Sequence, residues 1–221
     1  MFDDVLQFGL TQPFGGAPTP EENKIFGVAL ATVINNLDIT GEARVMLMLP
    51  WLPGVTPWAR IATPMAGMAR GMYFVPQIGD EVLVAFNHGD VREPYVIGSL
   101  WNTLDRPPVL DPTGPITTRK IRTPLGHELM FDEALQSVTL TSNTMSTVTL
   151  DPLKAEISTP LAKVSIGKAG DVTISGATKI TLDAPIIEIK AKALLTAQSN
   201  GSATFSASGT CFVQGALVKI N

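Results

Sequence analysis

The residues best suited to acid–base or metal chemistry are few, because the 221-residue sequence contains two histidines and one cysteine. His88 lies beside Gly89 in the stretch Asn87 to Asp90, and we interpret it as a solvated histidine in a hairpin loop. His127 precedes Glu128, and alternation along a strand would direct these two side chains to opposite faces. The histidines therefore predict neither a histidine–carboxylate pair nor a metal site.

The other nucleophilic and acidic residues also lack a catalytic arrangement. Cys211, the single cysteine, cannot form a disulfide within the chain, and it occupies an inward position of the apolar repeat described below, which indicates a small buried hydrophobe. Asp132 and Glu133 are interpreted as a turn cap. The sequence has no glycine-rich phosphate loop, no cysteine–histidine cluster and no Gly-x-Ser-x-Gly motif. We therefore expect no catalytic residue, no metal and no cofactor.

An apolar repeat occupies the sequence from Val164 to Asn221. Pairs of apolar residues, two positions apart, recur every eight residues, with the step twice shortened to seven. The alternation within each pair is that of a strand with one buried face, and such a repeat is typical of stacked β architectures. The side chains expected in the core of this rod are Val164, Ile166, Val172, Ile174, Ile180, Leu182, Ile187, Ile189, Phe205 and Val213.

The energetics of one repeat favour several copies of the chain. Two apolar side chains contribute roughly 1.5–3 kcal/mol each when fully buried. Fixing eight residues of backbone costs on the order of 8–16 kcal/mol. Hydrogen bonds and apolar surface shared with identical copies would offset the difference and close the open sheet edges. We infer an intertwined β-prism; the alternative is a single-chain β-helix.

The region before the repeat reads as a small barrel. Candidate strands over residues 25–34, 43–49, 58–62, 81–86 and 95–100 are separated by turn signals, which fits a five-stranded oligonucleotide/oligosaccharide-binding (OB) barrel. An N-terminal arm (1–22) precedes this domain (23–102). A stiff linker with four prolines (103–116) joins it to the rod domain (117–221).

The composition restricts the function. A net charge of −4 argues against a nucleic-acid partner. The sequence contains no run of 18 or more apolar residues, so we expect no membrane span. The acidic N-terminus, Met1 to Leu10, does not resemble a signal peptide. We therefore expect assembly in the cytoplasm.

The stretch from Trp58 to Asn102 closely resembles the OB domain of the baseplate spike family. This family comprises phage baseplate assembly protein V, the spikes of extracellular contractile injection systems and the VgrG spikes of type VI secretion. The matching landmarks are Trp58-Ala59-Arg60, Gly71, Phe74, Pro76, Gly79-Asp80-Glu81-Val82, Gly89-Asp90, Pro94 and Ile97-Gly98-Ser99-Leu100-Trp101-Asn102. Residues 122–131 resemble the entry into the family's rod, and residues 215–221 resemble the last rung of VgrG rods.

The resemblance implies a homotrimeric, membrane-puncturing spike at the tip of an inner tube, within a phage tail or injection particle. A separate hub or baseplate protein is expected at the N-terminal side, and effector cargo is possible in such a machine. Both histidines lie far from the C-terminal residues, so the iron-binding His-x-His apex of some phage spikes is not expected. A PAAR-repeat tip protein is expected to dock instead on Leu217, Val218, Lys219, Ile220 and Asn221.

The predicted fold class is all-β: an N-terminal OB barrel followed by a C-terminal triangular, intertwined trimeric β-helix. We predict a mechanical protein rather than an enzyme, in contact with the target membrane only during puncture. Two other classes remain open. One is an OB-fold module that binds carbohydrate or nucleic acid through Trp51, Trp58 or Trp101. The other is a polysaccharide-degrading β-helix enzyme, although the charged residues after Arg122 are scattered.

Overall fold

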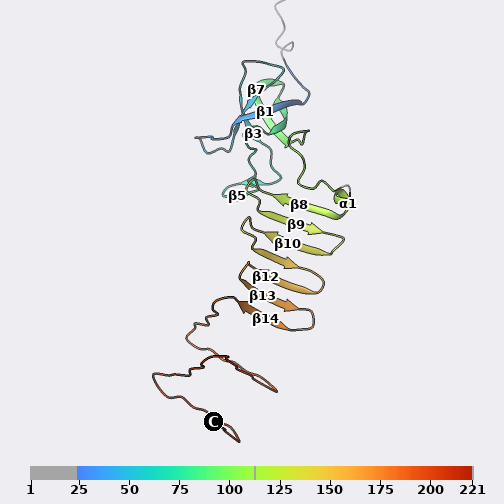
Figure 1. Cartoon of the computed structure of the whole chain (residues 1–221). Helices are drawn as coiled ribbons and strands as arrows, with labels where there is room; N and C mark the ends of the chain where they lie inside the picture. Colours follow the sequence, from blue (N-terminus) through green and yellow to red (C-terminus); the bar gives the residue numbers. More distant parts are fainter. Residues whose placement is uncertain (1–23, 112, 221) are drawn as a thin grey trace, which may run out of the picture.

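The computed structural model describes residues 24–111 and 113–220. The arm predicted at residues 1–22 and the docking residue Asn221 lie outside the described residues. Figure 1 shows a barrel at one end, a ladder of strands below it, and then the C-terminal segment. The described part of the chain is all-β apart from one turn of helix, which confirms the predicted class. That helix is too short to cross a membrane, and no other helix is found among the described residues.

The N-terminal unit is a closed five-stranded barrel. Around the barrel the order is β1-β2-β3-β7-β6, with β3 parallel to β7 and every other neighbouring pair antiparallel. This closure confirms the predicted OB-like barrel. Its strands are β1 (Ala29–Asn35), β2 (Val45–Met48), β3 (Trp58–Ile61), β6 (Glu81–Asn87) and β7 (Asp90–Ser99).

Every second side chain along the barrel strands points into the barrel interior and fills it. In β6, Val82, Val84 and Phe86 are buried and the residues between them are partly exposed. The expected start of the last barrel strand at Tyr95 was wrong, because β7 begins at Asp90 and runs through Pro94. The β6–β7 pairing shifts register between Phe86 and Asn87, beside Pro94. Such an irregularity lets a strand include a proline that cannot donate a ladder hydrogen bond.

Two small elements lie outside the barrel and the ladder. A hairpin of β4 (Ala66–Gly67) and β5 (Arg70–Gly71) projects from the connection between β3 and β6. Helix α1 (Gly114–Thr117) begins within the segment expected to be an extended linker. Pro115 favours this turn of helix, because proline lacks an N–H and is tolerated in the first turn.

The second large unit is a seven-stranded antiparallel sheet. Each strand pairs with the next in the chain, from β8 to β14, so the sheet is a simple meander. Asp132 caps the turn after β9 as predicted, because its Oδ1 accepts a hydrogen bond from Leu135 N at 2.9 Å. The strands are β8 (Thr118–Arg122), β9 (Glu128–Asp132), β10 (Ser137–Thr141), β11 (Thr147–Leu150), β12 (Lys154–Ser158), β13 (Ala162–Gly167) and β14 (Val172–Gly176).

The regular ladder ends at Gly176. The repeat predicted short strands as far as Asn221, but residues 177–220 contain no strand within the single chain. The physical reason is the absence of a partner, since a strand requires a neighbouring strand for its backbone hydrogen bonds. Residues 178–220 continue away from the sheet with no second segment paired to them (Figure 1).

Candidate assembly surface

One face of the β8–β14 sheet carries two columns of apolar side chains. Cross-strand partners in an antiparallel sheet lie on the same face, so the pairing register defines each column. The first column is Ile121, Leu129, Leu140, Val148, Ile157, Val164 and Ile174. The second column is Phe131, Val138, Leu150, Ala155, Ile166 and Val172. We call these two columns together the apolar face.

The apolar face is uncovered in the single chain. Most of its side chains are exposed, from 36% at Val148 to 63% at Val172, while Leu129, Val138 and Ala155 are partly buried. Burial of apolar side chains is the main favourable term in folding and association, and an exposed apolar area spread over seven strands indicates an interaction surface. The face therefore has the character of a core that is completed by another molecule.

The opposite face is polar. Glu156 on β12 accepts a charge-assisted hydrogen bond from Lys154 Nζ at 2.9 Å and lies 3.6 Å from Lys163 Nζ on β13. The hydrogen bond with Lys154 lowers the pKa of Glu156 below its ordinary value and raises that of Lys154. Lys120 and Glu128 form a similar pair at 3.0 Å. Such pairs add little stability at a surface, but they identify this face as the one that contacts water.

Arg119 is the exception on the apolar side. It pairs in register with Phe131 at the end of the sheet next to the barrel. Its guanidinium does not extend over the apolar columns. Nη1 donates to the carbonyl oxygens of Pro115 at 3.2 Å and Thr118 at 3.0 Å. Arg119 thus satisfies carbonyls around the end of α1, and the columns below it remain free of charge.

The predicted core residues fall into two groups. Val164, Ile166, Val172 and Ile174 lie together on the apolar face, as cross-strand neighbours of β13 and β14. The others lie in the strand-free segment with half or more of their surface exposed: Ile180, Leu182, Ile187, Ile189, Phe205 and Val213. The single chain brings the first group together and leaves the second group without contacts that would bury it.

Much of the apolar face was missing from the predicted core. Ile121, Leu129, Phe131 and the apolar residues of β10 and β11 show the same alternation in sequence, but their spacing is looser than the eight-residue repeat. Ala155 and Ile157 gave the same signal and were overlooked. Turns of differing length separate these strands, so a fixed step could not find them, whereas alternation within each strand could.

Residues 178–220 make no backbone–backbone hydrogen bond in the single chain, the last such bond being from Ala177 N to Leu161 O. Within this segment Ser199 Oγ donates to Ser202 O at 3.1 Å and accepts from Gly201 N at 3.2 Å. Extended chain rich in β-forming residues normally satisfies its backbone groups in a ladder. Most of the backbone N–H and C=O groups of this segment are therefore free to pair with strands of another molecule.

The predicted docking residues near the C-terminus are also exposed. Leu217 is 87% and Ile220 is 90% exposed, while Val218 is 48% exposed. Lys219 is exposed as well. Two large apolar side chains that project almost fully into solvent within four residues are available for a partner.

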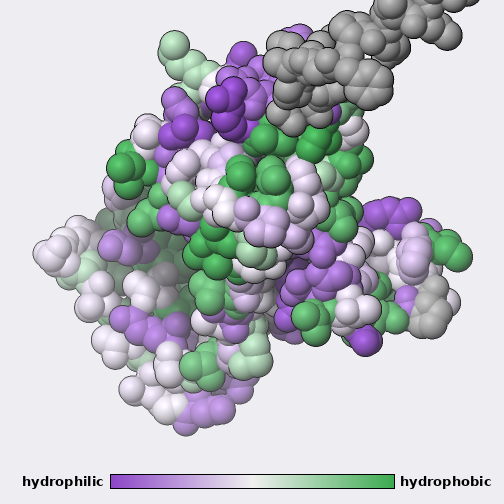
Figure 2. Space-filling view, turned by 90° about the horizontal axis from the view of Figure 1, so that it is seen from above, coloured by the Kyte–Doolittle hydropathy of each residue, from purple (hydrophilic) through white to green (hydrophobic). Residues whose placement is uncertain are grey.

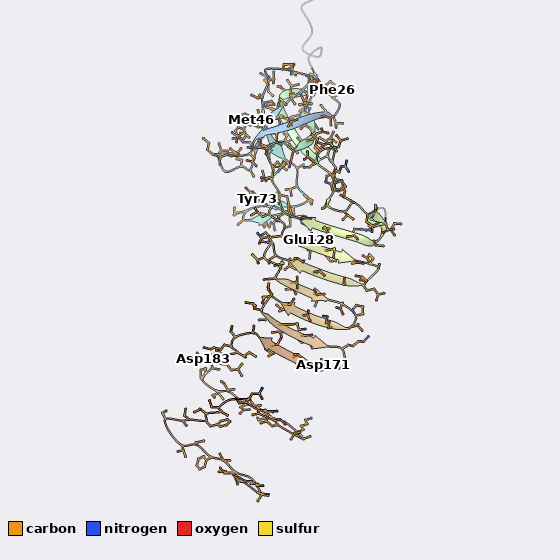
Figure 3. The ribbon with its side chains drawn as sticks, viewed as in Figure 1. Phe26, Met46, Tyr73, Glu128, Asp171 and Asp183 are labelled. Atoms are coloured by element: carbon orange, nitrogen blue, oxygen red, sulfur yellow. The ribbon has the colours of Figure 1, made fainter. Side chains whose placement is uncertain are left out.

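A second apolar surface lies at the barrel. A groove of about 600 Å³ is lined by Ile25, Val28, Ala29, Leu30, Pro50 and Trp51. Trp51 is fixed there, because its ring meets Phe86 edge-on and its Nε1 donates to Leu30 O at 3.3 Å. Phe26 is 76% exposed and lies at the barrel end away from the sheet (Figure 3). Seen from that end, hydrophobic residues form patches between hydrophilic ones (Figure 2).

The candidate chemical residues are dispersed in the structure. His88 adopts a left-handed conformation (φ 47°) in the β6–β7 turn, and His127 Nδ1 accepts a hydrogen bond from Asn143 N at 3.4 Å. Cys211, expected to be buried, is exposed in the single chain. Within the part of the chain that the structure describes, no three His, Cys, Asp or Glu residues gather as metal ligands would. The extended surfaces thus remain the best candidates for function.

Comparisons with known proteins agree with this architecture. Residues 29–101 match the family model described as the type VI secretion system/phage-baseplate injector OB domain. The chain is 29% identical over 136 residues to the type VI secretion system spike proteins VgrG2a and VgrG2b of Pseudomonas aeruginosa. It is 28% identical over 101 residues to the actin cross-linking toxin VgrG1 of Vibrio cholerae.

These alignments cover a larger fraction of this chain than of its relatives. They cover 55% of this chain but 16% of VgrG2a and 13% of VgrG2b, and 41% of this chain but 9% of the toxin. The chain thus spans less than a fifth of the length of these curated relatives. The barrel matches the injector OB domain, and the chain is similar to VgrG spike proteins, so the comparisons support a VgrG-like baseplate or spike family. This similarity supports a structural role in the spike or baseplate of a type VI or phage injection machine.

Proposed function

We propose that this protein is the central spike of a contractile injection machine and acts as a homotrimer. The observation that carries the proposal is the exposed apolar face, which is continuous over seven strands and leads into a segment without backbone–backbone hydrogen bonds. Three copies, the number that the spike family implies, would turn their apolar faces towards a common axis. The polar faces with Glu156 and Lys120 would form the outer surface.

The function of such a rod is mechanical. Three β8–β14 sheets would form the sides of a triangular prism, and residues 177–221 would wind around one another beyond it. Hydrogen-bond ladders between chains would distribute an axial load over many bonds. Interlocked chains separate only by unwinding together, which favours kinetic stability. The proposed role, puncture of a target membrane, uses no catalytic residue.

The two ends of the rod would bind different partners. The barrel end, with exposed Phe26 and the groove at Trp51, is proposed to dock a hub or baseplate protein on the inner tube. Residues 217–221 are proposed to form a small apolar platform for a PAAR-type tip protein. The assembled spike would be made in the bacterial cytoplasm and become part of a tail or injection particle, with or without effector cargo.

The experiment that tests this proposal is the molar mass of the purified protein by light scattering in native buffer. We expect three times the chain mass of 23.5 kDa. A monomer at micromolar concentration would refute the trimeric spike, because an uncovered apolar face of this size would then have no partner of its own kind.

A further inference from the structure

The β4–β5 hairpin presents a second uncovered apolar surface, separate from the sheet. Met65, Met68, Met72, Tyr73 and Phe74 are between 43% and 97% exposed, with Met68 the most exposed. Arg70 is the only charged residue from Thr63 to Ile78. Methionine side chains are flexible and polarizable, and they are common at contact surfaces that must fit an apolar partner.

The hairpin has a fixed shape despite its exposure. Thr63 Oγ1 donates to Met72 O at 2.8 Å, and Met72 N donates to Met65 O at 3.0 Å. Gly71 lies so close to the preceding strand that a Cβ there would be 2.7 Å from Met65 O. A surface held in this way loses little conformational entropy when it docks, which favours affinity.

The position of the hairpin restricts what it can contact. Figure 1 shows β5 at the level of β8, the first strand of the sheet, and Figure 3 shows Tyr73 just above the sheet. Rotational symmetry about the long axis keeps every feature at its own level along that axis. The hairpin of one copy can therefore meet the hairpin, α1, β8 and β9 of the next copy, but not the strands further along the rod.

The two faces of β8 and β9 differ in polarity. The polar face carries Lys120, paired with Glu128, and an apolar hairpin there would desolvate charges at a cost. The apolar face carries Ile121 and Phe131, which are 46% and 41% exposed. We propose that the β4–β5 hairpin of each copy packs against Ile121 and Phe131 of a neighbouring copy. This proposal rests on the trimer of the proposed function and adds a specific contact between subunits.

Photo-crosslinking from the hairpin tests the contact directly. p-Benzoylphenylalanine replaces Tyr73, which is similar in size and 78% exposed, and in a control variant it replaces Thr139 on the polar face of β10. After irradiation and boiling in SDS, the Tyr73 variant should give covalent dimers and trimers, with crosslinked peptides from residues 118–132 of a second copy. The Thr139 variant should remain monomeric on the gel.

A pair of matched substitutions gives an independent readout. Met68 and Met145 both lie in hairpin turns and are 97% and 73% exposed in the single chain. Met68→Asp should lower the temperature at which the trimer dissociates in SDS by at least about 5 °C, and Met145→Asp should leave it unchanged. A trimeric mass with no crosslink between copies, or with crosslinks only to barrel strands, would overturn the hairpin contact alone. A monomeric mass before irradiation would overturn the proposed function itself.

Discussion

At the scale of single residues, Val172 and Thr173 are neighbours in β14 that lie on opposite faces of the sheet. Val172 pairs with Ile166 on the apolar face, and Thr173 pairs with Ser165 on the polar face. Val172→Asp would place three unpaired carboxylates near the axis of a trimer, at a cost of several kcal/mol for each. We expect this variant to elute as a monomer in size-exclusion chromatography.

Thr173→Asp is the control, because it introduces the same charge one residue away. It should retain the trimeric mass. Equal behaviour of the two variants would show that the apolar face is not the contact between subunits.

Asp38 contributes to the acid stability of the barrel. Its carboxylate lies between β1 and β2, where Oδ2 accepts hydrogen bonds from Arg44 N and Nε, both at 3.1 Å. The side-chain hydrogen bond with Arg44 holds the pKa of Asp38 far below its ordinary value of 3.8. Ionised Asp38 therefore stabilises the fold above that ordinary value, and this contribution is lost as the pH falls towards the folded-state pKa.

The prediction for Asp38 is a difference in melting temperature that depends on pH. Asp38→Asn should melt below the wild type at pH 7, and the two curves should converge as the pH falls below about 4. Asp183→Asn, far from the barrel (Figure 3), should show no such dependence. Parallel curves for Asp38→Asn and the wild type over this range would contradict the role of Arg44. Calorimetry from pH 7 to pH 2 measures the melting temperatures of the three proteins.

At the scale of elements, the sheet and the C-terminal segment differ in where their hydrogen bonds come from. Strands β8–β14 form their ladders within one chain, whereas residues 178–220 form none. If the segment winds with two other copies, its amides become protected only in the trimer. We expect hydrogen exchange of residues 178–220 to be slowed at least about 100-fold relative to unstructured peptide in the assembled protein. Rapid exchange there in a protein of trimeric mass would exclude an intertwined end.

The barrel could be predicted from sequence because its information is local. Apolar residues alternate along β6, and the turn residues between strands mark the boundaries to within a few positions. The start of β7 at Asp90 could not be found, because Pro94 normally argues against a strand and the register shift that accommodates it leaves no mark in the sequence. The hairpin at Met68 gave no signal either, since its strands are only two residues long.

The structure of the rod could be predicted from sequence only in part. The apolar pairs correctly placed Val164, Ile166, Val172 and Ile174 on one face. The same pattern predicted strands at Ile180 and beyond, which do not form in the single chain. Periodicity reports which side chains need burial, but a ladder also requires a partner strand, and the sequence of one chain does not say whether that partner is itself or another copy.

At the scale of the whole molecule, the proposed trimer has two ends that can be disabled separately. The barrel forms its own closed core, and the β8–β14 sheet forms its own ladder, so neither depends on the last residues. Leu217 and Ile220 are exposed and bury nothing within the chain. Removal of residues 215–221 should therefore leave the trimeric mass intact while a PAAR-type tip protein no longer co-purifies.

A matched change at the other end completes the test. Phe26→Asp, at the barrel end (Figure 3), should retain the tip protein and reduce binding of the hub or baseplate protein by at least about 10-fold, because a large apolar side chain is replaced by a charge at a docking surface. If removal of residues 215–221 instead abolished the trimer, those residues would serve assembly rather than docking. If both variants kept both partners, the two ends of the rod would have to be reassigned, although the packing of the apolar faces would stand.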